Sequence, residues 1–146
     1  MISLSPASAH AADWLNLRAA LWPDCPAAEH QQEIAEQTAN PARFAAFVAR
    51  DDDAAIGLLE VAIRNDYVNG TSRSPVAFVE GIYVAPSHRR AGVAALLLGA
   101  AREWARARDC AELASDTALD NLTAQAAHLA LGFEETERVV FYRMAL

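Results

Sequence analysis

The segment from Val76 to Ala94 constrains the fold of this chain more than any other part of the sequence. It begins with an almost entirely apolar run that ends at Val84, and Pro86 stops this run because proline cannot continue a strand ladder. A helix is predicted from about Gly92 to Arg108, since apolar residues recur along it at helical spacing. The sequence therefore predicts a buried strand directly before a long amphipathic helix.

The turn between this strand and helix has the composition of an anion site. It contains two basic residues, Arg89 and Arg90, and then Gly92, which allows backbone to approach a ligand closely. The first amides of a helix have no partners within it and lie at the positive end of its dipole, which suits a pyrophosphate. The alternative is a simple loop with an early glycine. The turn is neither a Walker loop nor a three-glycine dinucleotide fingerprint.

The rest of the chain alternates helices and strands. The predicted elements are helices over 9–22 and 26–38, strands over 44–50 and 55–65, a short strand over 112–115, a helix capped by Asp120 through Leu131, and a last strand over 136–144. This order predicts an α/β fold with a mixed sheet and helices on its faces. Its 146 residues fit one domain, 1–146, with one core.

Composition and charge exclude several classes of function. There is no run of about 18 apolar residues, so we expect no membrane span, and no secretory signal is evident, so the cytoplasm is the expected location. The net charge of −7 argues against a nucleic-acid partner. An acidic surface either only keeps a protein soluble or also attracts polycationic substrates. No metal site is predicted.

The turn resembles motif A of the GNAT superfamily of acetyltransferases, Gln/Arg-x-x-Gly-x-Gly/Ala, which Arg89, Gly92 and Ala94 match. Longer blocks resemble the bacterial aminoglycoside 6′-N-acetyltransferases in the same order along the chain. These blocks are Trp22-Pro23, 67–71, 75–84, 114–121 and 132–140. The resemblance implies a GNAT fold, with a mostly antiparallel sheet splayed between strands four and five, here at Val84 and Ser115.

The resemblance also implies acetyl-CoA as co-substrate, with its pantetheine arm between the splayed strands, and a homodimer. The residues expected to bind the cofactor are Ile82, Val84, Arg89, Arg90, Gly92, Val93, Ala94 and Asn121. In this family the acceptor amine attacks the thioester directly, without an acyl-enzyme.

Two carboxylates are the candidates for catalysis. An alkyl ammonium has a pKa of about 10 and must lose a proton before it attacks, so a base or a water chain is needed. Glu80 lies in an otherwise apolar strand, and burying a carboxylate is costly unless it is paired or functional. Asp116 follows strand five, where open sheets bind ligands. The alternatives are a solvent-facing Glu80 and a turn or capping role for Asp116.

The remaining acceptor candidates are aromatic or acidic, as a polycationic sugar requires. They are Trp22, Tyr67, Glu135 and Glu137, which join Glu80 and Asp116. Trp22 is equally consistent with a core position, and the two glutamates with surface charge. His128 stands where many GNAT enzymes have the tyrosine that protonates the leaving thiolate, and a histidine satisfied within its helix is the alternative.

Three hypotheses follow. The first is an aminoglycoside 6′-N-acetyltransferase that confers resistance. The second is a GNAT enzyme for a polyamine or other small amine, which the same acidic residues would bind. The third, an acyl-CoA-binding sensor without turnover, would keep motif A and lose its bases, yet Glu80 and Asp116 are both present.

Overall fold

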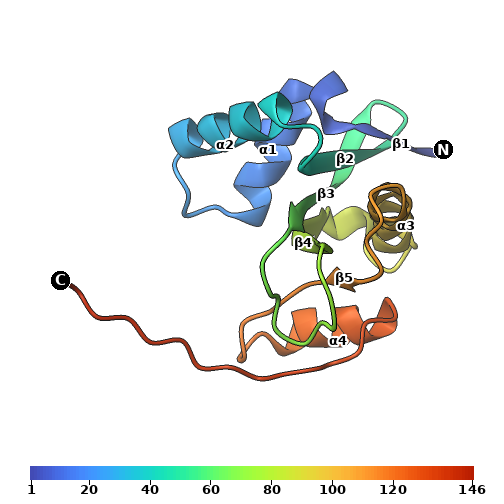
Figure 1. Cartoon of the computed structure of the whole chain (residues 1–146). Helices are drawn as coiled ribbons and strands as arrows, with labels where there is room; N and C mark the ends of the chain where they lie inside the picture. The colour runs from blue at the N-terminus through green and yellow to red at the C-terminus, as the bar shows by residue number, and fades with distance from the viewer.

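The computed structural model describes all residues, 1–146, and centres on a five-stranded sheet (Figure 1). The strands, in their order across the sheet, are β1 (Ile2–Pro6), β2 (Phe44–Asp51), β3 (Ala54–Arg64), β4 (Val76–Val84) and β5 (Leu113–Ala114). β1 to β4 pair antiparallel, whereas β4 and β5 pair parallel. The predicted mixed, mostly antiparallel sheet is confirmed, although β1 was not anticipated from the sequence.

Helices cover both faces of the sheet. α1 (Ala11–Leu21) and α2 (Ala27–Ala39) lie over one face, and α3 (Val93–Arg106) lies over the other (Figure 1). Because side chains alternate along a strand, β3 serves both faces: Leu58 packs with α1, and Leu59 with α3. Two short 3₁₀ turns, η1 (Ala7–Ala9) and η2 (Pro86–His88), precede α1 and α3. None of the helices has the length and apolarity to cross a bilayer.

β4 and β5 separate soon after they meet. They pair only at Ala77 with Leu113 and at Phe78 with Ala114. Residues 79–84 of β4 therefore have no strand beside them on that edge, while β3 pairs with their other edge. The splay expected between these two strands is confirmed, and it opens toward the turn before α3.

The end of the chain departs from expectation. α4 (Leu122–Ala130) lies beside β5, and its cap is Asn121 rather than the predicted Asp120: the Asn121 side-chain Oδ1 accepts from the Ala124 amide at 3.1 Å. The strand predicted over 136–144 is absent, and the segment runs away from the sheet (Figure 1). The alternating pattern is real, but a strand also needs a neighbouring edge, and the segment meets none within its own chain.

Candidate active site

The turn before α3 has the backbone geometry that an anion site needs. Gly92 caps the helix with φ 81° and ψ 6°, the left-handed conformation that a side chain disfavours. A Cβ at Gly92 would meet no atom within 4 Å, so the space in front of the turn is open. No side chain caps α3, which leaves its first-turn amides available to a ligand. Val93 is buried and anchors this turn in the core.

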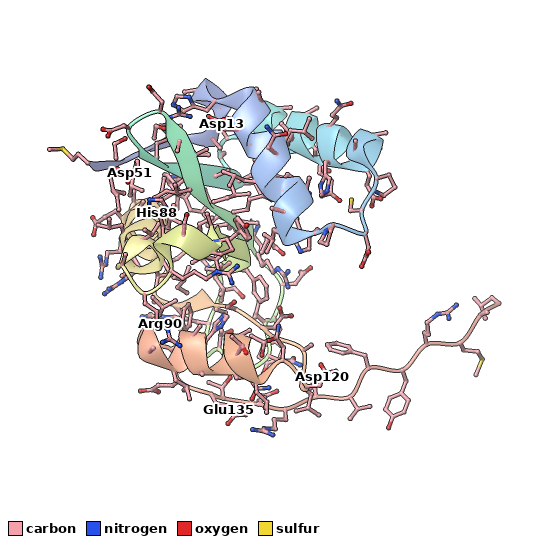
Figure 2. The ribbon with its side chains drawn as sticks, turned by 180° about the vertical axis from the view of Figure 1, so that it is seen from behind. Asp13, Asp51, His88, Arg90, Asp120 and Glu135 are labelled. Atoms are coloured by element: carbon pink, nitrogen blue, oxygen red, sulfur yellow. The ribbon has the colours of Figure 1, made fainter.

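The two arginines of the turn have different roles in the structure. Arg89 folds back on β4, where its Nε donates to the Val84 carbonyl at 2.9 Å. Arg90 has φ 60°, is exposed, and enters no ion pair in the structure. Figure 2 shows Arg90 on the side of the molecule where α3 and α4 lie. Arg89 thus fixes the turn to the end of β4 through its Nε, while its terminal NH groups and the whole Arg90 guanidinium remain for an anion.

The other expected cofactor residues surround the splay. Ile82 and Val84 are half-buried on the part of β4 that lacks a β5 neighbour. Ala94 lies in the first turn of α3 and is half-buried. Asn121 is exposed at the start of α4, and its side-chain carbonyl is already used in capping. The NH₂ group of Asn121 donates no hydrogen bond within the chain and is free to donate to a ligand.

A cavity of about 750 Å³ lies between the α1–α2 pair and the sheet. Two of the predicted acceptor residues, Trp22 and Glu80, line it. The cavity also holds charged groups that were not predicted from the sequence, which are Asp24, Glu33, Glu36, Glu60 and Arg18. The cavity is therefore strongly acidic, as the binding of a polycation requires.

Glu80 reaches this cavity because β4 carries a bulge. Glu60 pairs with Gly81 and its neighbour Val61 pairs with Val79, so Glu80 is the extra residue on β4. A bulge re-aims a side chain, and bulges are frequent beside active sites. The Glu80 side chain is 36% exposed and accepts from Arg64 at 3.0 and 3.1 Å. Glu80 is thus an accessible carboxylate, not the buried one that its apolar strand suggested.

Glu60 is the buried carboxylate of the site. It is 2% exposed, and its oxygens accept from Arg18 at 2.6 and 2.7 Å, from Trp14 at 2.8 Å and from Gln37 at 2.7 Å. An unpaired buried charge is very costly, and this one is fully paired. The signal in the sequence was present: Glu60 interrupts an apolar strand just as Glu80 does.

The remaining acceptor candidates do not line the cavity. Asp116 is exposed just beyond β5, and Tyr67 is 71% exposed in the loop after β3. Glu135 pairs with Arg138 at 2.5 Å, and Figure 2 shows it at the α4 end of the molecule, away from α1 and α2. Glu137 is exposed in the C-terminal segment. The structure brings together Trp22 and Glu80, and leaves these four residues outside their cavity.

The loop that carries Tyr67 does contact the start of the C-terminal segment. A Cβ at Gly70 would collide with the side chain of Thr136, and Gly70 has a φ of 80°, so only glycine fits this close approach. The same loop is fixed to the chain before β5, because Glu112 accepts from the amide and hydroxyl of Ser72 at 2.8 Å. These hydrogen bonds hold the pKa of Glu112 below its usual value.

Comparison with known proteins agrees with this geometry. The model of the Acetyltransferase (GNAT) family matches residues 12–133. This chain belongs to the GNAT acetyltransferase family. It is 54% identical to the aminoglycoside N(6′)-acetyltransferase type 1 of Serratia marcescens, over 91% of each chain, and 49% identical to that of Acinetobacter haemolyticus, over 97% of each. These relatives place it in the aminoglycoside 6′-N-acetyltransferase branch of the GNAT family.

Solved structures share the whole fold of this GNAT acetyltransferase. AAC(6′)-Iy in complex with the bisubstrate analogue CoA-S-monomethyl-acetylneamine superposes with a TM-score of 0.95 at 43% identity, covering 100% of this chain and 99% of that one. The apo aminoglycoside 6′-N-acetyltransferase AAC(6′)-Ig of Acinetobacter haemolyticus gives 0.94 at 46% identity, covering 99% of each. The GNAT fold expected from the sequence is confirmed.

His128, at the position of the usual GNAT tyrosine, is satisfied by its neighbours. Its Nδ1 lies 2.7 Å from the Ala124 carbonyl, which can only accept, so Nδ1 carries the proton. Its Nε2 then accepts from the Ser115 hydroxyl at 2.8 Å. The ring also packs 5.1 Å from Phe133. In this GNAT acetyltransferase the histidine joins α4 to the end of β5.

Proposed function

We propose that this protein transfers the acetyl group of acetyl-CoA to the 6′-amino group of aminoglycoside antibiotics, by direct attack in a ternary complex, and so confers resistance. The observation that carries this proposal is the position of β4 between two sites. Glu80 of β4 faces the acidic cavity, and the unpaired edge a few residues later leads to the anion turn of α3. One strand thus connects a polycation site to a pyrophosphate site.

On the donor side, the residues present fit acetyl-CoA. The first-turn amides of α3 have no capping side chain, and the space before Gly92 is open, so a pyrophosphate can be held there with help from Arg90. The unpaired edge of β4 offers amides to the thioester carbonyl, where negative charge develops during attack. The proposed cofactor residues are Ile82, Val84, Arg89, Arg90, Gly92, Val93, Ala94 and Asn121.

On the acceptor side, carboxylates must hold ammonium groups and remove one proton. We assign the base to Asp116 and Glu80. Glu80 lines the cavity, and Asp116, outside it just beyond β5, is retained because it matches the active-site aspartate of the family. The proposed acceptor residues are Trp22, Tyr67, Glu80, Asp116, Glu135 and Glu137. Asp24 and Glu36 also line the cavity and are exposed, so they supply further negative charge to the other amines of the substrate.

A homodimer is the assembly that the C-terminal segment favours. Its apolar side chains are strongly exposed: Val140 is 72%, Phe141 85% and Tyr142 92% exposed. Each copy carries this alternating segment without a neighbour, and each also presents the outer edge of β5, at the end of the sheet. An exchange of segments between two copies satisfies both, with the symmetry typical of homodimers. Sedimentation should show a dimer, and a chain ending at Arg138 should sediment as a monomer.

We also propose that residues 1–146 act as one acetyltransferase domain in the cytoplasm. Acetyl-CoA is available there, and the two cysteines of the chain are free thiols, as a reducing compartment maintains. A polyamine is the second candidate acceptor, because the carboxylates of the cavity attract any flexible polycation. The indole of Trp22 in the cavity wall favours a ring over a flexible chain.

The test is thiol release from acetyl-CoA with kanamycin, tobramycin, spermidine and basic peptides in parallel. We expect saturable turnover with both aminoglycosides and a much smaller kcat/KM with the other acceptors. A protein that binds acetyl-CoA but acetylates neither aminoglycoside would contradict the proposal. Spermidine turned over more efficiently than both would support the second candidate instead.

A further inference from the structure

We propose that Arg18 and His30 are positioning residues for the acceptor. They act through a chain of buried hydrogen bonds that holds the indole of Trp22 against Gly81, beside Glu80. This inference rests on the proposed function in one respect, which is that Trp22 forms part of the acceptor site. Neither Arg18 nor His30 was identified from the sequence.

The first step is the fixed orientation of Arg18. Its side chain is 2% exposed, and its NH1 donates to both oxygens of the equally buried Glu60. Its NH2 donates to Glu33 at the cavity wall. A guanidinium is planar, so these two contacts determine the direction in which its Nε–H points. That direction is toward His30.

The second step is the tautomer of His30, which is 1% exposed. Arg18 Nε lies 3.1 Å from His30 Nδ1, and arginine has no acceptor, so Nδ1 must accept. The proton of the neutral ring is therefore on Nε2. Nε2 lies 3.2 Å from the carbonyl of Trp22, to which it donates. The buried ion pair is thus connected through His30 to the backbone of Trp22.

The third step is the place of the indole. The Arg18 guanidinium carbon lies 4.8 Å from the centroid of the Trp22 ring, within cation–π range. A Cβ on Gly81 would lie 2.6 Å from Trp22 Cζ2 and 2.7 Å from Cη2. The ring therefore rests on bare backbone, next to Glu80. Arg18 contacts the Trp22 ring, and His30 donates to its backbone carbonyl, which also accepts from the Cys25 amide at 3.2 Å. Arg18 and His30 are the two side chains whose removal would loosen the ring.

The consequence is an acceptor wall that is in position before the acceptor arrives. Trp22 follows the last residue of α1, in a loop whose next residues, Pro23 and Asp24, are exposed. Without the contacts to Arg18 and His30, ordering this loop would be a cost of acceptor binding. The contacts of Arg18 and His30 with Trp22 should therefore lower the KM for the acceptor. They should leave kcat at saturation and the KM for acetyl-CoA unchanged.

The experiment compares His30→Leu, which removes both hydrogen bonds, with His30→Gln, whose amide can accept from Arg18 and donate to Trp22. We expect His30→Leu to raise the KM for tobramycin about tenfold, because the lost hydrogen bond to the Trp22 carbonyl is worth about 1.4 kcal/mol of acceptor binding. We expect His30→Gln to have a KM for tobramycin close to that of wild type, and the KM for acetyl-CoA to be unchanged in both variants. Equal KM values for wild type and His30→Leu, or a rise shared by acetyl-CoA, would overturn the proposal.

A second readout does not depend on activity. In protein labelled with 5-fluorotryptophan, the ¹⁹F resonance assigned to Trp22 should shift or broaden in His30→Leu and return in His30→Gln, while that of Trp104 stays in place. An unmoved Trp22 resonance refutes the positioning role. If wild type fails to acetylate any aminoglycoside, the proposed function fails, but this spectrum still decides whether Arg18 and His30 hold Trp22.

A double-mutant cycle and one further variant complete the test. If His30 acts through Trp22, His30→Leu should add no further rise in tobramycin KM to a Trp22→Ala enzyme. Additive effects would overturn the proposal. Should His30→Leu fail to fold, Gly81→Ala displaces the ring from the other side, and the same rise in tobramycin KM is expected. A Gly81→Ala enzyme with unchanged tobramycin KM would count equally against the proposal.

Discussion

The donor and acceptor sides of this GNAT acetyltransferase are built in opposite ways. The donor turn comes from one continuous stretch, 76–94, and it presents mainly backbone groups and open space. The acceptor cavity takes its side chains from α1, α2, the loop between them, and three strands, and a buried ion pair lies beneath it. The donor ligand can thus be fixed by local sequence, while the acceptor site depends on the tertiary structure and can vary separately.

The largest expected effect is on kcat, and it tests whether the acceptor side can be disabled without changing the donor side. Replacing both Glu80 and Asp116 by alanine should lower kcat about 10³-fold, because general-base catalysis contributes at least two orders of magnitude. Binding of CoA, measured by calorimetry, should stay unchanged, since neither residue lies in the turn before α3. Full activity in the double variant would remove both carboxylates from the mechanism. A parallel loss of CoA binding would mean that the two sides are not separate.

The next effect concerns stability and is confined to the acceptor side. Glu60→Gln removes the buried one of the two carboxylates that pair with Arg18, and we expect a loss of about 3 kcal/mol in the free energy of unfolding. Urea titration measures this loss. The control is Glu36→Gln, an exposed position of the same cavity, which should change stability by less than about 0.5 kcal/mol. If both variants change the free energy of unfolding by similarly small amounts, the buried pair of Arg18 and Glu60 does not stabilise the acceptor side.

A smaller effect is expected on the donor side alone. Gly92→Val puts a β-branched residue at φ 81°, so the turn must distort, and we expect the Kd for acetyl-CoA to rise about tenfold. The matched control is Gly99→Ala within α3, where a Cβ meets no atom within 4 Å. That variant should keep the Kd and gain some stability, because alanine favours helix. Loss of acetyl-CoA affinity in the control would implicate α3 as a whole.

The smallest expected effect is the pH dependence of folding stability that Asp51 contributes. Hydrogen bonds from His88 and the N-terminal amine, both at 3.0 Å, hold the pKa of Asp51 below its ordinary value. Figure 2 shows Asp51 and His88 close together. A lowered folded pKa adds stability that is complete above the ordinary value of about 3.9 and is lost as pH falls through the folded value. Asp51→Asn should therefore lose less stability than wild type on acidification, as measured by urea midpoints. If the urea midpoints of wild type and Asp51→Asn fall in parallel on acidification, Asp51 does not cause the loss of stability in acid.

The sequence was most informative where structure is set by neighbours along the chain. The limits of β4 were predicted to the residue, and those of α3 to within two, because an apolar run and a helical stripe are local patterns. The turn between them was predicted as an anion site from Gly92 and from its position between a strand and a helix. Trp22 and Glu80 were also predicted for one site, through resemblance to a family.

The sequence was least informative where contacts are distant along the chain. Nothing in a helix containing Arg18 indicates that it meets Glu60 of β3, and the bulge that turns Glu80 outward arises from pairing between strands. β1 was missed because its pattern is short and half polar. The strand expected over 136–144 was wrong for a related reason, since a strand needs a partner edge and no strand of this sheet pairs with the segment.

The unpaired edge of β4 also bears on how long the enzyme survives in a cell. A ligand that binds beside this edge, and binds only the folded protein, raises the free energy of unfolding. The gain grows with the logarithm of the ligand concentration divided by Kd. When acetyl-CoA is plentiful, fewer molecules open and reach the proteases. The folded fraction of the enzyme would then rise with the concentration of its own co-substrate.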